Sequence, residues 1–283
     1  LAVLLLAEVF IKTPKPENNI QTNVKIDKKK DEENKITPNI SQLKVPEIIS
    51  REESIQNVER IKIENSNVAG SISLRGAIID DLSFKKYKKE LEKEDKVVFL
   101  NPKETPNGYF VETGWTSIGD KIQVPKNDTK WKVKGNKKLT QNKDIVLEWD
   151  NKEGLIFKKI INLDDKYLFR ISQEVENKTN KTIELFPYAQ ITRNEKPKDV
   201  TDFYILHEGF IGVFDDELKE DDYDDVQEKK IVRESDEGWL GITDKYWMTA
   251  FVPETGKNFK STFLYEDGFK ANYIINKPTT INK

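Results

Sequence analysis

The sequence predicts an all-β protein built around a large antiparallel β-sandwich. From Arg60 onward, short apolar alternations with a period of two residues are separated by turn residues, which is typical of strands with one buried face and one solvated face. Hydrophobic residues make up 36% of the chain, and 14 Phe, 9 Tyr and 5 Trp are available to fill a core. Because no convincing long helix interrupts these segments, antiparallel sheets are favoured over an α/β arrangement.

The clearest predicted strand is YLFRISQEV, in which Tyr167, Phe169, Ile171 and Val175 share one face. The polar run NKTNK predicts a turn, and a second alternation over residues 183–191 completes a predicted hairpin. Further strands are predicted near residues 61–63, 71–74, 145–149, 155–163, 203–205 and 248–251. The glycines that punctuate them are Gly70, Gly76, Gly135 and Gly154.

The N-terminal part of the chain differs in composition from the rest. Residues 1–11, LAVLLLAEVFI, are expected to be the C-terminal end of a transmembrane helix, with a signal-peptide core as the alternative. Residues 12–59 are rich in Lys, Asn, Glu and Pro and predict a flexible tether, within which residues 48–58 form either a short helix or no regular structure. The sandwich domain is expected to cover residues 60–283 and to be truncated at its C-terminus.

Charge and sulfur content exclude several classes of function. The 47 basic and 50 acidic residues nearly balance, and only six of the basic residues are Arg, which argues against nucleic acid as a partner. The chain has no Cys, so it forms neither disulfides nor thiolate metal sites. This composition is compatible with a periplasmic location.

No pattern in the sequence nominates a catalytic, metal or cofactor site. His207 is the only histidine, which excludes a His-based zinc site of the HExxH type, and no GxSxG motif accompanies it. The acidic run Asp215–Asp225 lacks the glycine and spacing of a calcium loop, so a solvated loop is favoured. Phosphate-binding and dinucleotide fingerprints are missing from the sequence. A catalytic pair of carboxylates acting on a glycosidic bond stays possible, because the distance between two carboxylates in the fold cannot be read from the sequence.

The aromatic residues are the most informative set. Large rings within strand-like segments usually fill a core, and this is the favoured interpretation of most of them. The functional alternative is an exposed aromatic patch that contacts a partner protein. The candidate partner contacts are Trp239, Tyr246 and Trp247, which lie close together in the segment GWLGITDKYW.

The order of motifs along the chain resembles that of a known family. The motifs run SLRGAIIDDLSFKKYKKE, GYFVETGW, KWKV, IVLEWDNKEGLIFKKIINLDDKYLFRISQEVEN, LFPYAQITR, ILHEGFIGV and EGWLGITDKYWMTAFVP. In this order and spacing, they resemble the periplasmic domain of YidC membrane protein insertases, particularly those of alphaproteobacteria. The resemblance covers residues 61–275.

The resemblance implies a β-supersandwich similar to galactose-mutarotase-like domains, placed in the periplasm after a first transmembrane helix in the bacterial inner membrane. It also implies a chaperone and insertase role with nascent inner-membrane proteins and the Sec translocon as partners, and contact with the lipid bilayer through the N-terminal helix. The membrane core that carries the insertion activity is expected to lie outside this chain. We therefore expect a non-catalytic role in binding or positioning, with no cofactor.

The same fold likeness suggests a second hypothesis, a carbohydrate-binding or mutarotase-like domain. A site of that kind is expected to combine a histidine with a carboxylate around one sugar. Here His207 is followed by Glu208, and neighbouring residues on a strand point to opposite faces of a sheet. The sequence therefore favours the insertase domain, while a carboxylate distant in sequence keeps the sugar hypothesis open.

Overall fold

The computed structural model describes residues 49–283, except residues 91, 119–121 and 198–206. The predicted membrane-helix end and the strand near residues 203–205 lie outside the described residues. Almost all regular structure in the described part is β-strand, and the core holds apolar residues from every sheet, which confirms the predicted all-β sandwich. Among the described residues, no helix has the length and apolar character needed to cross a bilayer.

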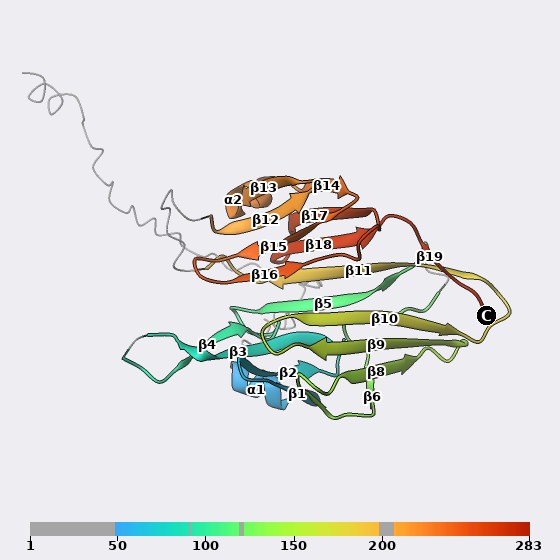
Figure 1. The fold of residues 1–283 in the computed structure, drawn as a ribbon, viewed down its shortest axis with the longest axis horizontal. Coiled ribbons are helices and arrows are strands. Elements are labelled where there is room, and N and C mark those ends of the chain that lie inside the picture. Colours follow the sequence, from blue (N-terminus) through green and yellow to red (C-terminus); the bar gives the residue numbers. More distant parts are fainter. Residues whose placement is uncertain (1–48, 91, 119–121, 198–206) are drawn as a thin grey trace, which may run out of the picture. The chain divides into compact units, whose positions relative to one another are not determined.

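One large sheet forms the first layer of the sandwich (Figure 1). Its strands pair in the order β14-β17-β18-β11-β5-β3-β2-β1-β7, and β19 and β4 add to β11 and β3 respectively. These strands are β1 (Arg60–Glu64), β2 (Val68–Ser73), β3 (Ile78–Lys88), β4 (Lys96–Leu100), β5 (Tyr109–Thr116), β7 (Lys138–Leu139), β11 (Ile183–Arg193), β14 (Ile231–Ser235), β17 (Phe259–Tyr265), β18 (Phe269–Ile275) and β19 (Thr279–Ile281).

Two four-stranded sheets pack on this layer. The first has the order β10-β9-β8-β6 and consists of β6 (Lys132–Lys134), β8 (Ile145–Asp150), β9 (Leu155–Leu163) and β10 (Phe169–Asn177). The second has the order β13-β12-β15-β16 and consists of β12 (Gly209–Phe214), β13 (Glu217–Asp222), β15 (Gly238–Thr243) and β16 (Met248–Phe251). Strands β10 and β16 are therefore edge strands of their sheets.

Contacts between the layers show which part of the large sheet each small sheet covers. The ring of Phe210 on β12 lies 5.0 Å from that of Phe263 on β17, so the second small sheet covers the β17–β18 region. The Nζ atom of Lys159 on β9 donates a hydrogen bond to the carbonyl oxygen of Thr113 on β5 at 2.6 Å, so the first small sheet covers the β5 region. The two small sheets thus lie on different parts of one large sheet.

The sequence predicted the individual strands better than their partners. Strand β10 alternates as expected, and it pairs with β9 over nine residues from Phe169↔Leu163 to Asn177↔Leu155. The predicted hairpin of β10 with β11 is wrong, because β11 pairs with β5, β18 and β19 in the large sheet. The turn between them carries the chain from one layer to the other, where β11 buries residues in the large sheet and β10 half-buries one face.

Gly70 was predicted to separate strands, but it lies inside β2. A Cβ atom at this position would collide with the carbonyl oxygen of Asp81 on the neighbouring strand β3. The glycine is therefore required by close backbone approach between two paired strands, which is a different reason from the formation of a turn.

A short helix, α1 (Arg51–Gln56), precedes the first strand, so the helical alternative for residues 48–58 is the one that the structure shows. Ser50 caps the helix by accepting a hydrogen bond from the backbone of Glu53 at 3.2 Å. Arg51 forms an ion pair with Asp81 on β3, which holds α1 against the large sheet. The proposed tether thus has a structured end, while its residues 12–48 lie outside the described ranges. The second helix, α2 (Tyr223–Glu228), packs on the large sheet through Tyr223, whose ring lies 4.8 Å from that of Phe269.

Candidate functional site

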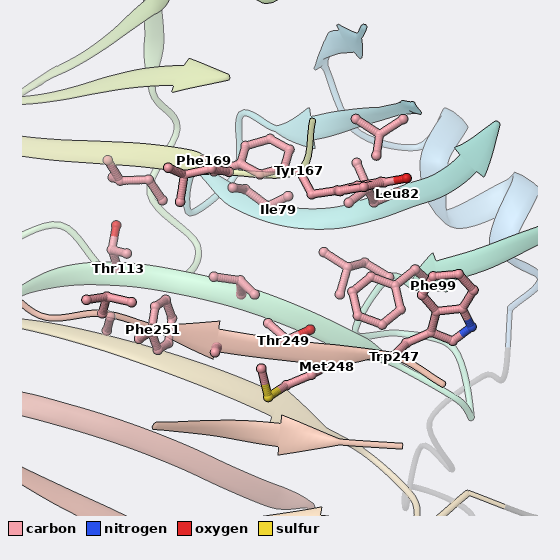
Figure 2. A pocket seen from close by; sticks show the side chains of 18 of the residues that line it. Ile79, Leu82, Phe99, Thr113, Tyr167, Phe169, Trp247, Met248, Thr249 and Phe251 are labelled. Carbon is pink, nitrogen blue, oxygen red and sulfur yellow. The ribbon is translucent and has the colours of Figure 1, made fainter. Parts of the chain in front are cut away.

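An apolar groove of about 480 Å³ lies between the edge strands β10 and β16. Its floor comes from the large sheet, and Figure 2 shows Tyr167 and Phe169 on one side of it and Trp247 and Phe251 on the other. The groove is of the size and apolar character typical of ligand-binding clefts. The residues that line the groove include Ile79, Leu82, Phe84, Tyr87, Phe99, Val111, Thr113, Tyr167, Phe169, Ile171, Gln173, Ala189, Tyr246, Trp247, Met248, Thr249, Ala250, Phe251, Val252 and Tyr273.

Aromatic rings gather at one end of the groove. The ring of Phe84 is 4.3 Å from that of Trp247, 5.0 Å from that of Phe99 and 5.7 Å from that of Tyr167. Tyr87 packs edge-on against Trp247 at 4.7 Å. Rings from four separate segments of the chain therefore form one cluster, and edge-to-face and offset contacts of this kind stabilise it beyond the area buried.

The three aromatic residues predicted as partner contacts do not form one patch. Tyr246 is 73% exposed at the groove end, and Trp247 is partly buried in the ring cluster. Trp239 pairs with Val213 across β15 and β12, on the face of the sheet opposite to the buried neighbour Leu240. Two of the three residues thus line the groove, whereas Trp239 lies on the outer face of the same sheet.

The turn that presents Tyr246 and Trp247 is held by a partly buried ion pair. The backbone N–H of Asp244 donates a hydrogen bond to the carbonyl oxygen of Trp247 at 2.8 Å, which closes the turn between β15 and β16. The guanidinium of Arg193 donates to both carboxylate oxygens of Asp244 at 2.6 Å and lies 4.7 Å from the ring of Tyr109. This fork ties the turn to strand β11 of the large sheet.

A lysine lies buried beyond the inner end of the groove. Lys159 is 2% exposed, and its Nζ atom donates to the carbonyl oxygen of Thr113 and lies 5.0 Å from the centre of the Trp131 ring. Burial in this apolar surrounding lowers the pKa of Lys159 to about 7. The residue pairs with Gln173 across β9 and β10. The buried Oε1 atom of Gln173 has no hydrogen-bond partner among the described residues.

His207 does not line the groove. Its Nε2 atom lies 2.8 Å from the carbonyl oxygen of Phe210, and its Nδ1 atom lies 3.5 Å from the carboxylate of Asp222. The acidic run is split between β13 and α2. Within the ranges that the structure describes, no group of three or more His, Asp or Glu side chains is placed to bind a metal ion. A sugar site built on His207 would therefore lie apart from the groove.

Sequence reasoning missed most of the groove. Phe169 and Ile171 were correctly placed on one face of a strand, yet that face was assigned to the core. Tyr167 was wrongly placed in the same strand, since it lies in the bend before β10. In the structure, β10 and β16 alternate between half-buried and exposed residues without a fully buried row. No sequence signal distinguished these two strands from strands of the core.

Comparison with known proteins identifies relatives over most of the chain. The family model described as the YidC periplasmic domain matches residues 60–283. A protein named membrane protein insertase YidC from Pelagibacter ubique is 42% identical over 276 residues, which cover 98% of this chain and 49% of that protein. The protein of the same name from Rickettsia bellii is 36% identical over 94% of this chain and 46% of its own length. The chain thus spans about half the length of these relatives.

Among solved structures, a galactose mutarotase related enzyme from Lactobacillus acidophilus matches with a TM-score of 0.49 and 12% sequence identity, over 79% of this chain and 93% of that one. The sequence relatives include alphaproteobacterial proteins, which confirms the resemblance seen in the order of motifs. The family model covers far more than half of the 283 residues. The chain belongs to the YidC periplasmic domain family.

Proposed function

We propose that this domain is a non-catalytic, polypeptide-binding part of a membrane protein insertase and chaperone of the bacterial inner membrane. In this proposal, the domain lies in the periplasm, and the groove between β10 and β16 receives apolar segments of nascent inner-membrane proteins. The observation that carries it is the groove itself, an apolar cleft ringed by aromatic side chains in a domain whose relatives are named insertases.

The chemistry of the lining supports binding over catalysis. None of the described side chains that line the groove is a carboxylate, imidazole, amine or guanidinium, and the polar groups are amide, hydroxyl and indole groups. General acid–base or nucleophilic chemistry most often uses His, Asp, Glu, Lys or Cys within hydrogen-bonding reach of a substrate, and the titratable side chains of this lining are tyrosine phenols alone. Aromatic rings, in contrast, contribute large contact areas at modest cost in conformational entropy.

Further partners follow from the family and belong to the same proposal. The Sec translocon is proposed to work with the whole insertase, and the lipid bilayer is proposed to hold the protein through the helix ending at residues 1–11. Residues 60–283 then act as the folded domain at the end of the tether. The carbohydrate hypothesis gains no support, since His207 lies outside the groove.

Site-specific photo-crosslinking tests this proposal. Benzoylphenylalanine replaces Tyr246 in the full-length protein, and ribosome-bound inner-membrane clients are stalled during insertion. The matched control replaces Leu218, which is 56% exposed on β13 and does not line the groove. We expect client crosslinks from position 246 and few from position 218. Equal crosslinking from both positions, or none from 246, would contradict a client site in the groove.

A further inference from the structure

We propose that the groove recognises its client as an extended strand, whose backbone pairs with the free edges of β16 and β10 and whose ends carry acidic residues in place of basic ones. This inference rests on the proposed function and adds the conformation and chemical class of the bound segment. Three observations carry it: two unpaired strand edges, a buried acceptor without a partner, and a basic rim.

The outer edge of β16 presents unpaired backbone groups to the groove. Asp244 and Trp247 are a hydrogen-bonded pair, and the register continues as Thr243↔Met248, Ile242↔Thr249 and Gly241↔Ala250. Hydrogen-bonded and non-hydrogen-bonded pairs alternate in antiparallel ladders. The N–H and C=O groups of Met248 and Ala250 therefore point away from β15. No strand of the described part of the chain pairs with this edge.

The opposite wall has the same property. Asp164 donates to the carbonyl of Leu168 at 3.1 Å, and at the other end Lys178 donates to the carbonyl of Gly154 at 2.8 Å. Counting along the register from either end places Phe169, Ile171 and Gln173 in non-hydrogen-bonded pairs with β9. Their N–H and C=O groups therefore point away from β9, and all three residues line the groove.

Free edges of this kind are templates for an additional strand. An extended segment lying between β10 and β16 finds donors and acceptors on both sides, and the unpartnered Oε1 atom of Gln173 accepts one further N–H group. A helical segment satisfies its own backbone groups and leaves those of the groove unpaired. Because buried unpaired polar groups are costly, the groove favours an extended backbone over a helical one.

The floor sets the side-chain pattern of the bound segment. Ile79, Leu82, Val111 and Ala189 are apolar and lie beneath the gap between the two edges. Side chains of a strand alternate between its two faces. Every second residue of the segment therefore points to the floor and is expected to be apolar, while the intervening residues face solvent.

The rim adds a preference for charge. The three exposed tyrosines that line the groove, Tyr87, Tyr167 and Tyr246, are each preceded by an exposed lysine. These lysines are Lys86, Lys166 and Lys245. Of the carboxylates next to them in sequence, Asp244 is occupied by Arg193 and only Asp165 is left to oppose them. The rim is therefore basic and is complementary to acidic residues.

This charge preference fits the side of the membrane on which the domain is proposed to lie. Short loops on the cytoplasmic side of membrane proteins are rich in Lys and Arg, so the translocated flanks of transmembrane segments are poor in them. A basic rim repels Lys-rich and Arg-rich flanks and accepts neutral or acidic ones. The rim is thus expected to favour translocated segments over cytoplasmic ones.

Backbone-modified peptides test the strand pairing. The probe is a fluorescent ten-residue peptide with alternating Leu and Thr and an Asp at each end, bound to full-length protein in lipid nanodiscs and followed by anisotropy. N-methylation of every second residue removes the N–H groups that point to one neighbouring strand. We expect the two alternate N-methylated sets each to weaken binding at least tenfold, because both walls supply partners. Unchanged binding of both modified peptides would overturn the strand model.

A pair of variants at one position tests the β16 edge in the protein itself. Ala250→Pro removes the N–H that faces the groove, whereas Ala250→Val keeps it and adds similar bulk. We expect Ala250→Pro to weaken peptide binding about tenfold and Ala250→Val to change it less than threefold, with equal thermal unfolding temperatures. Equal binding by the two folded variants would exclude pairing at β16. Client crosslinks from position 246 that persist in that case would preserve the proposed function while the strand model fails.

Charge reversal tests the rim. The triple variant Lys86→Glu, Lys166→Glu and Lys245→Glu is expected to lose at least fivefold in affinity for the Asp-ended peptide and to gain affinity for the same peptide with Lys at its ends. The matched control carries Lys126→Glu, Lys137→Glu and Lys230→Glu, at exposed lysines that are not adjacent in sequence to a residue lining the groove. Equal effects of the two triple variants would show that only net charge matters and would refute a selective rim.

Discussion

The rings of Trp247 and Phe84 lie 4.3 Å apart, so the turn before β16 is packed directly on strand β3 of the large sheet. This contact closes one end of the groove. It joins a residue of the second small sheet to a strand that is distant in sequence, and it fixes the position of the β16 edge relative to the floor.

We predict that Trp247→Ala lowers the free energy of unfolding by about 2 kcal/mol, below the range for fully buried aromatic residues because the indole is only partly buried. Tyr246→Ala is the control, since this neighbour is 73% exposed and its removal is expected to cost at most about 0.5 kcal/mol. Urea denaturation measures both. Similar losses for the two variants would show that the ring cluster does not hold the turn.

The fork between Arg193 and Asp244 gives a second prediction. Asp244→Ala leaves a guanidinium whose side chain is 16% exposed without its carboxylate, and we expect a loss of about 3 kcal/mol. The double variant Arg193→Met with Asp244→Ala removes both charges and is expected to be more stable than Asp244→Ala alone. A double-mutant cycle by denaturation measures the coupling energy. Additive losses would contradict a paired role for these residues.

Burial of Lys159 makes the free energy of unfolding depend on pH in a specific way. Its pKa in the folded protein is lowered to about 7 from 10.5, so between these values the unfolded chain binds more protons than the folded one. Stability therefore rises with pH across this window, with a slope from this residue of up to about 1.4 kcal/mol per pH unit. Below pH 7 both states are protonated and the full cost of burying the charge remains.

Lys159→Met is expected to remove this slope and to raise stability at pH 7, because a methionine fills the same space without a charge. The matched control is Lys158→Met on the same strand, whose side chain is 30% exposed and pairs with Glu176. Unfolding is measured from pH 7 to pH 9.5. A slope that is the same in Lys159→Met as in the unsubstituted protein would show that Lys159 titrates normally.

Two positions hold glycine for different reasons: Gly70 allows close backbone approach between paired strands, and Gly135 adopts a turn conformation. Gly70→Ala places a Cβ atom against the carbonyl of Asp81 inside paired strands, and we expect a loss of about 3 kcal/mol or more, as for overpacking in a core. Gly135 has φ +78° and open space around its Cα, so Gly135→Ala is expected to cost about 1 kcal/mol. Thermal unfolding compares them. The reverse order would contradict the β2–β3 packing.

The sequence allowed prediction of some strands in which apolar and polar residues alternate. Leu155–Leu163 and Met248–Phe251 were predicted with the bounds that the structure has, whereas β17 and β18 were not predicted although each buries residues of one face. Pairing was not predictable in the same way. Residues Asn177–Lys181 have the polar composition of a hairpin turn, yet they connect two layers, since turn composition does not determine which strands become neighbours.

The groove depends on relations that no local pattern contains. Phe84 and Trp247 are separated by more than half of the chain. Their contact requires the two small sheets to leave a gap between them where they cover the large sheet. The segment GWLGITDKYW is part of the series of motifs that predicted the family correctly, and it contains two groove residues. It could not indicate that Trp239, on the same short segment, lies on the opposite face of the sheet.

The central claim, that a client segment lies between β10 and β16, is tested most directly by hydrogen–deuterium exchange of the full-length protein with and without a stalled client. The account predicts slower exchange in two peptides, one covering residues 168–174 and one covering residues 247–252, because their free edge amides become hydrogen-bonded. Segments away from the groove, such as β13 at the opposite edge of the second small sheet, are expected to exchange unchanged. Protection elsewhere with no change in these two peptides would contradict the account.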